Sequence, residues 1–138
     1  MKRNIFKLGI LAGTIIALNT VALGATIGDG TVDDYNGYIK GNRQNTWLGD
    51  AYRGTTKKSD PFYVSLEDSD EGSGTVTRFW IEDKNENNLC DTRDVTQGKG
   101  FYPQNTYQAG CNKHVYLTAE NNNYNQDIYR IEGQWTEE

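Results

Sequence analysis

The chain has 138 residues, 14 Lys or Arg against 19 Asp or Glu, and a formal net charge of −5. This acidic balance argues against nucleic acid and anionic membrane surfaces as partners, because both attract basic proteins. The length fits one domain. Leu, Ile and Val are scarce while Tyr and Trp number nine and three, so aromatic side chains must fill much of the core.

The first 24 residues have the features of a secretory signal peptide. Three basic residues precede an apolar run over residues 8–23, and Ala22 and Gly24 place small residues at positions −3 and −1 of a cut after Gly24. The run is shorter than the roughly 20 residues of a membrane-spanning helix, and no later stretch is apolar enough to span. We expect residues 25–138 to be secreted, with a net charge of −8 once the three basic residues are removed.

Beyond the signal peptide, the sequence predicts a loosely ordered segment over residues 25–45 and one all-β domain over residues 46–138. The first segment combines Gly, Asp, Asn and Thr without a clear period, whereas the second contains short runs of alternating apolar and polar residues. The runs lie at 44–53, 62–67, 75–82, 92–97, 113–120 and 127–135. About six or seven short strands separated by turns predict a small antiparallel β-sandwich, and a small open barrel is the alternative.

Cys90 and Cys111 are the two cysteines of the chain. In an extracellular, oxidising compartment an even pair of cysteines indicates a disulfide. Closing this loop of about 20 residues would stabilise the fold by roughly 3 kcal/mol in the chain-entropy account. Two free thiols or a metal pair are the alternatives, although a lone cysteine pair makes a poor zinc site.

The loop over residues 83–94 has the spacing of a calcium-binding loop. Positions 1, 3, 5, 9 and 12 of the loop are Asp83, Asn85, Asn87, Asp91 and Asp94. Calcium takes about six to eight oxygen ligands, and this spacing can wind them around one centre. Position 6 is Asn88 instead of glycine, and strands flank the loop instead of helices. A polar hairpin turn is therefore the alternative.

Aromatic residues on polar strand faces or in turns are candidates for ligand binding. They include Trp80, Tyr102, Tyr116 and Tyr124. Aromatic platforms beside Asn and Asp suit sugars or a protein partner. Trp80 belongs to the run 75–82, whose two faces are both mixed, so the sequence leaves open which face is buried. A core position for Trp80 is the alternative.

Catalysis has little support in the sequence. His114 is the only histidine, and its strand points it away from the apolar Val115 and Leu117, which favours an exposed position. The chain contains no nucleophile elbow, phosphate-binding loop or zinc-protease motif. We therefore expect a non-enzymatic protein that needs no cofactor, unless the 83–94 loop binds calcium.

Four short motifs carry a resemblance to a known family. They are Gly72–Thr75, Phe79-Trp80, Ala119–Tyr124 and Gly133–Glu138. They resemble a family of small exported proteins of Gram-positive bacteria that is catalogued as a domain of unknown function, over roughly residues 47–138. The chain is also similar to lactococcin-like secreted bacteriocins in size, export signal and content of Gly, Asn and Tyr.

This resemblance implies a secreted β-sandwich without known catalytic residues. Such a protein would act on other cells or at the cell envelope. A binding module for wall glycan or for a surface partner, with or without calcium, is the alternative. The molecular target and the oligomeric state are not indicated by the sequence.

Overall fold

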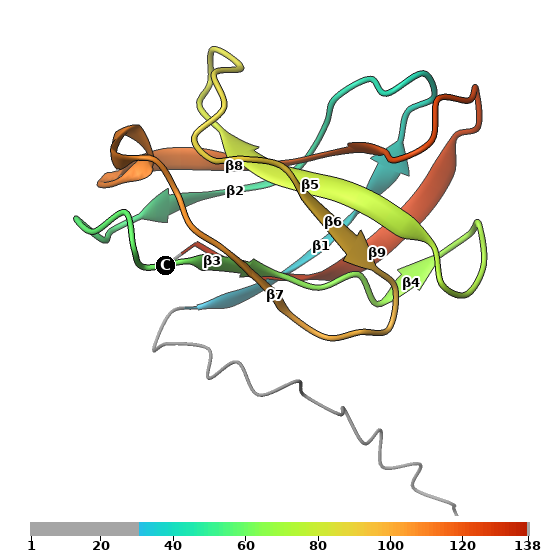
Figure 1. Cartoon of the computed structure of the whole chain (residues 1–138), viewed down its shortest axis with the longest axis horizontal. Coiled ribbons are helices and arrows are strands. Elements are labelled where there is room, and N and C mark those ends of the chain that lie inside the picture. Colours follow the sequence, from blue (N-terminus) through green and yellow to red (C-terminus); the bar gives the residue numbers. More distant parts are fainter. Residues whose placement is uncertain (1–30, 138) are drawn as a thin grey trace, which may run out of the picture.

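The computed structural model describes residues 31–137, which fold into two antiparallel sheets packed face to face (Figure 1). The signal peptide predicted over residues 1–24 and the following residues 25–30 lie outside the described residues. The strands are β1 (Val32–Ile39), β2 (Thr46–Arg53), β3 (Phe62–Val64), β4 (Asp68–Ser69), β5 (Val76–Glu82), β6 (Arg93–Thr96), β7 (Tyr102–Gln104), β8 (Lys113–Asn121) and β9 (Tyr129–Thr136). A short 3-10 helix, η1, covers Gln108–Gly110.

One sheet has the order β1-β9-β3-β7, with β4 also paired to β9, and the other has the order β2-β8-β5-β6. The predicted β-sandwich is thereby confirmed. The structure adds β1, β4 and β7 to the strands expected from the sequence. Both β4 and β7 are short, which is why they leave no alternating pattern. Among residues 31–137, no helix has the length and apolar character that a membrane span requires.

The inward faces of both sheets build the core through strand alternation, as the period of two requires. Its fully buried members include Ile39, Phe62, Val64, Phe79, Ile81, Val115, Leu117, Ile131 and Trp135. Tyr35 is also buried, and its hydroxyl donates to the Ser65 carbonyl at 2.6 Å. A Cβ on neighbouring Gly133 would lie 2.2 Å from that carbonyl oxygen, so only glycine allows this close approach.

The segment expected to be loosely ordered contains β1. This strand pairs with β9 along its whole length, from Val32 opposite Thr136 to Ile39 opposite Tyr129. The expectation was wrong for residues 32–39 because most of their side chains are polar or small and only Tyr35 and Ile39 are buried. The strand is held by a partner about a hundred residues away, which no local pattern reveals.

The two cysteines are free thiols in the structure, so the disulfide predicted from their number is not formed. Cys90 is buried at the base of the 83–92 loop, where its Sγ accepts from the Ile81 N–H at 3.2 Å. Cys111 is only partly buried. Burial is the main reason that the pKa of the Cys90 thiol rises to about 12. A thiol with so high a pKa is a weak nucleophile at neutral pH.

Candidate functional site

Four ring-bearing side chains meet on the outer face of the four-stranded sheet. Trp47 of β2 stacks on Tyr116 of β8, with ring centroids 4.6 Å apart and planes at 25°. Tyr52 of β2 meets His114 of β8 edge-on, with centroids 5.7 Å apart. Trp47 is 47% exposed and Tyr52 53%. We call Trp47, Tyr52, His114 and Tyr116 the aromatic face.

A β-bulge in β2 places Trp47 and Tyr52 on the same side of the sheet. Trp47 lies opposite Thr118, and Gly49 lies opposite the next residue of β8, so Leu48 is the extra residue. In a regular strand, residues five positions apart point to opposite faces. The one-residue insertion reverses this relation and brings both rings to the outer face.

A buried carboxylate orients Trp47 of this face and its neighbour Trp80. Glu82 of β5 is fully buried. One of its oxygens accepts from the indole N–H of Trp47, and the other accepts from that of Trp80 at 2.9 Å. A buried carboxylate is tolerated only when hydrogen bonds compensate its lost hydration. Bonds to an ionised acceptor are also stronger than neutral ones, so the Trp47 ring is held in one orientation.

Trp80 lies beside the aromatic face but does not form part of its exposed surface. It is only 3% exposed, although it lies on the outer side of the sheet. Trp47 and Trp80 are both paired with Thr118, one from each side, and Thr118 is fully buried between them. The expectation of an exposed Trp80 is therefore wrong, and the residue has the buried position that was the alternative.

A polar hollow of about 260 Å³ opens beside the aromatic face. Its lining consists of Asp83, Lys84, Asn85, Lys113, His114 and Tyr116. Two of these residues also belong to the aromatic face, so ring surfaces and hydrogen-bonding groups share one border. Binding sites for small ligands combine these two elements, with rings for contact area and a few polar groups for orientation.

Asp83, the first residue expected to bind calcium, stabilises the hairpin turn. Its Oδ1 accepts from the backbone N–H groups of Asn85 at 2.9 Å and Asn87 at 3.1 Å. The Asn87 side chain also donates to both carboxylate oxygens at 3.1 Å. These bonds from Asn87, first the side chain and then the backbone, lower the pKa of Asp83. This is the chemistry of an Asx turn.

The five residues proposed for calcium are not brought together. Asp94 pairs with Arg78 of β5, whereas Asp83 follows the last residue of that strand, about 16 Å away at the rise of an extended chain. Asp91 accepts from the Tyr107 hydroxyl at 2.5 Å. Within residues 31–137, no three His, Cys, Asp or Glu side chains form a group that could hold a metal ion. The geometry favours the hairpin turn.

Comparison with known proteins gives a family but no activity. Residues 23–138 match the family described as Protein of unknown function (DUF2712). The chain belongs to the DUF2712 family. The membership expected from the sequence, in a family of unknown function, is thus confirmed. Neither the curated proteins nor the solved structures give a match.

The other tyrosines predicted to bind lie elsewhere on this DUF2712 protein. Tyr102 is half-buried against the core with the Arg93 guanidinium over its ring at 5.4 Å. Tyr124 is exposed in the β8–β9 turn under Arg43, at 5.7 Å. Of the four predicted residues, only Tyr116 joins the aromatic face. Trp47 and Tyr52 were missed as members of one exposed face because the bulge interrupts their alternation.

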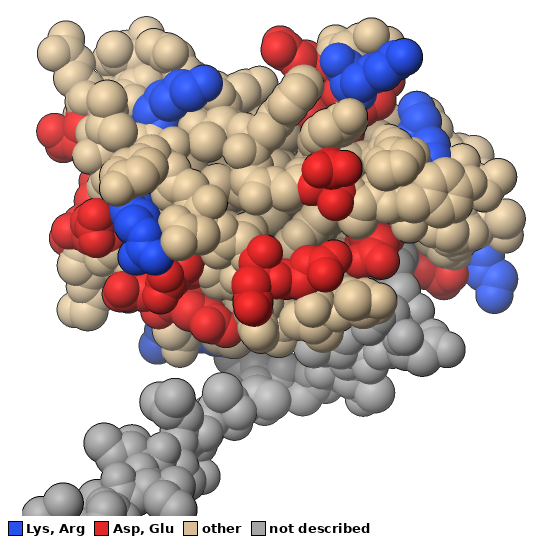
Figure 2. Space-filling model, turned by 180° about the vertical axis from the view of Figure 1, so that it is seen from behind, with Lys and Arg blue, Asp and Glu red and all other residues tan. Residues whose placement is uncertain are grey.

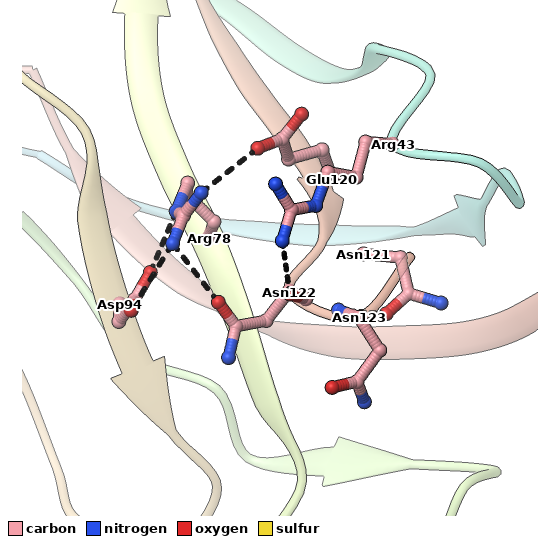
Figure 3. Close-up of polar contacts among 7 residues, drawn as sticks. All are labelled: Arg43, Arg78, Asp94, Glu120, Asn121, Asn122 and Asn123. Carbon is pink, nitrogen blue, oxygen red and sulfur yellow. Dashed lines mark hydrogen bonds and ion pairs between the residues drawn. The ribbon is translucent and has the colours of Figure 1, made fainter. Parts of the chain in front are cut away.

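At the other end of the same sheet, an ion-pair network ties β5, β6 and β8 together in this DUF2712 protein (Figure 3). Arg78 donates to Asp94 at 2.8 Å, to Glu120 at 3.3 Å and to the Asn122 side chain at 3.1 Å. Arg43 donates to the Asn122 carbonyl at 3.3 Å. The hydrogen bond that Arg78 donates to Asp94 is the largest cause of the raised pKa of Arg78. These mutual bonds indicate that the network stiffens the sheet.

Proposed function

We propose that this DUF2712 protein is a secreted, non-enzymatic binding module that holds a glycan of the cell envelope on its aromatic face. The observation that carries the proposal is the exposed Trp47 ring, stacked on Tyr116 and oriented by the buried Glu82. An exposed aromatic cluster normally marks an interaction surface, because isolated exposed rings are common but grouped ones are not.

The aromatic face and the polar hollow together suit a sugar. The C–H side of a pyranose ring packs on an aromatic ring, while its hydroxyls need hydrogen-bond partners at the edge. Trp47 and Tyr52 supply ring surface, and Asn85 and Lys84 in the hollow supply polar groups. A hollow of about 260 Å³ is smaller than the roughly 300–1,000 Å³ of a drug-sized site, which favours a single ring as the occupant.

The fixed geometry of the aromatic face also supports binding. Ordering a side chain on association costs about 0.5–1.5 kcal/mol. Glu82 already orders Trp47 before any ligand arrives, since the indole N–H is engaged in the free protein. The affinity of the face for a sugar should therefore depend on Glu82, although this residue is buried and contacts no ligand.

The proposal leaves out catalysis and killing activity. His114 contacts the Asp50 carboxylate at 3.8 Å and the Tyr52 ring, and both the imidazole and the carboxylate are mostly exposed. An imidazole and a carboxylate that are both open to solvent fit an exposed binding surface. We do not extend the proposal to a bacteriocin-like activity, because no feature of residues 31–137 supports one.

Retention on purified peptidoglycan tests the proposal. The matched variants are Tyr52→Ala on β2 and Tyr38→Ala on β1, which remove tyrosines with similar exposure, 53% and 62%, from different sheets. Loss of a stacking ring worth about 1.4 kcal/mol corresponds to a tenfold change in affinity. We expect about that loss for Tyr52→Ala and for Trp47→Ala, and wild-type retention for Tyr38→Ala. Equal retention of all variants would contradict the proposal.

A further inference from the structure

A second groove, of about 620 Å³, opens at the side of the sandwich. Its lining consists of Lys58, Ser59, Asp91, Arg93 and residues 103–107. Arg93 of β6 and residues 103–104 of β7 line the groove. These strands are the edges of the two sheets, and consecutive chain connects them (Figure 1). None of these residues belongs to the aromatic face, so the groove is a separate place on the molecule.

The two cations of this groove are free to meet a ligand. None of the ion pairs found among residues 31–137 includes Lys58 or Arg93. The Arg93 guanidinium lies over the Tyr102 ring, with its central carbon 5.4 Å from the ring centroid. The backbone carbonyl of Lys58 accepts from the Thr106 N–H at 3.3 Å. This bond fixes the segment that contains Lys58 relative to the segment that contains Thr106.

The one carboxylate in the lining is already engaged. Asp91 accepts from the Tyr107 hydroxyl at 2.5 Å. This hydrogen bond is the main cause of the raised pKa of Tyr107, so the phenol keeps its proton. The groove therefore presents two unpaired cations, while its only anion is turned toward a neighbouring donor.

Thr106, a residue of the groove lining, has a buried hydroxyl without a partner in residues 31–137. Thr106 is only 5% exposed, and its hydroxyl has no hydrogen-bond partner among the described residues. A buried polar group without a partner destabilises the free protein. This hydroxyl is shielded from solvent, so it does not face the groove and is not one of its ligand-binding groups.

We propose that the groove binds a phosphate group, as a free phosphate ester or within a phosphate-containing polymer. Arginine matches the oxygens of phosphate with two parallel N–H donors, and lysine adds a point charge. The two cations of the groove contrast with the chain as a whole, which has a net charge of −5 and a band of acidic side chains across the face shown in Figure 2. The proposal does not depend on glycan binding at the aromatic face.

Titration with inorganic phosphate at constant ionic strength, followed by backbone amide NMR, tests this site. Arg93→Gln is the test variant. Arg43→Gln is its matched control, since Arg43 also lies over a tyrosine ring, at 5.7 Å, but outside the groove. We expect phosphate to shift the amides of residues 104–107. Loss of a charged hydrogen-bond donor should weaken binding about tenfold in Arg93→Gln and leave Arg43→Gln unchanged.

Two further arms complete the experiment. Thr106→Val should raise the melting temperature of the free protein, because it removes the unpartnered hydroxyl, and should leave phosphate binding unchanged, because that hydroxyl is shielded from solvent. Sodium acetate should bind more weakly than phosphate. Equal dissociation constants for the two arginine variants would overturn the proposal, as would equal affinity for acetate and phosphate or shifts spread evenly over the protein.

Discussion

Replacing Glu82 by glutamine tests whether the buried carboxylate organises the aromatic face. In the native protein each carboxylate oxygen accepts from one indole, Trp47 or Trp80. Glutamine keeps one acceptor oxygen and turns an NH2 group toward the other indole N–H. One hydrogen bond to a charged group, worth about 1.5–3 kcal/mol, is lost. Removing a buried charge offsets part of this cost, so we expect a net loss of about 1–2 kcal/mol.

Urea unfolding followed by circular dichroism measures this loss, with Glu86→Gln as the control. Glu86 is an exposed residue of the 83–88 turn, so its substitution should leave the free energy of unfolding unchanged within about 0.5 kcal/mol. In thermal melts, Glu82→Gln should lower the midpoint by about 4–8 °C for each kcal/mol lost in a domain of this size. The reasoning would be refuted by a Glu82→Gln protein at least as stable as Glu86→Gln.

Three other predictions follow from the loop, the thiols and the export signal. The pKa of Asp83 is lowered in the folded state, so its stabilisation is complete above the ordinary value of 3.8 and is lost as the pH falls through the folded-state pKa. Asp83→Ala should thus lower the melting temperature at pH 7 with calcium or with chelator, and a calcium-dependent melt of the wild type would contradict the turn assignment. Iodoacetamide should label Cys111 before Cys90, because Cys90 is buried and its pKa is raised to about 12; native protein without titratable thiols would contradict free cysteines. N-terminal sequencing of the exported protein should begin at Ala25, and an intact Met1 would disprove cleavage.

Local alternation in the sequence predicts the parts of the fold that depend on neighbouring residues. Phe62 and Val64 of β3 are buried as their spacing indicates, and so are Val115 and Leu117 of β8. His114, which precedes Val115 near the start of β8, is exposed as expected. Each of these strands has one apolar and one polar face, so the period of two is enough to assign the buried side.

Features that depend on distant partners could not be predicted in this way. β1 is stabilised by β9 at the other end of the chain. Trp47 and Tyr52 share a face only because a bulge forms against β8. Glu82 looks like a surface residue in sequence, and only the meeting of two indoles from β2 and β5 buries it. In each case the decisive contact joins segments that are far apart in the sequence.

The indole N–H signals of the three tryptophans give the most direct test of the aromatic face. In an NMR titration of the native protein with a soluble N-acetylglucosamine oligomer, the Trp47 signal should shift most, because its ring is half exposed. Trp80 is buried beside it, is bonded to the same Glu82, and should shift less. Trp135 is buried in the core and should stay in place. Saturable shifts of Trp47 in this order are the predicted result, whereas an unchanged Trp47 signal at millimolar oligomer would contradict glycan binding at this face.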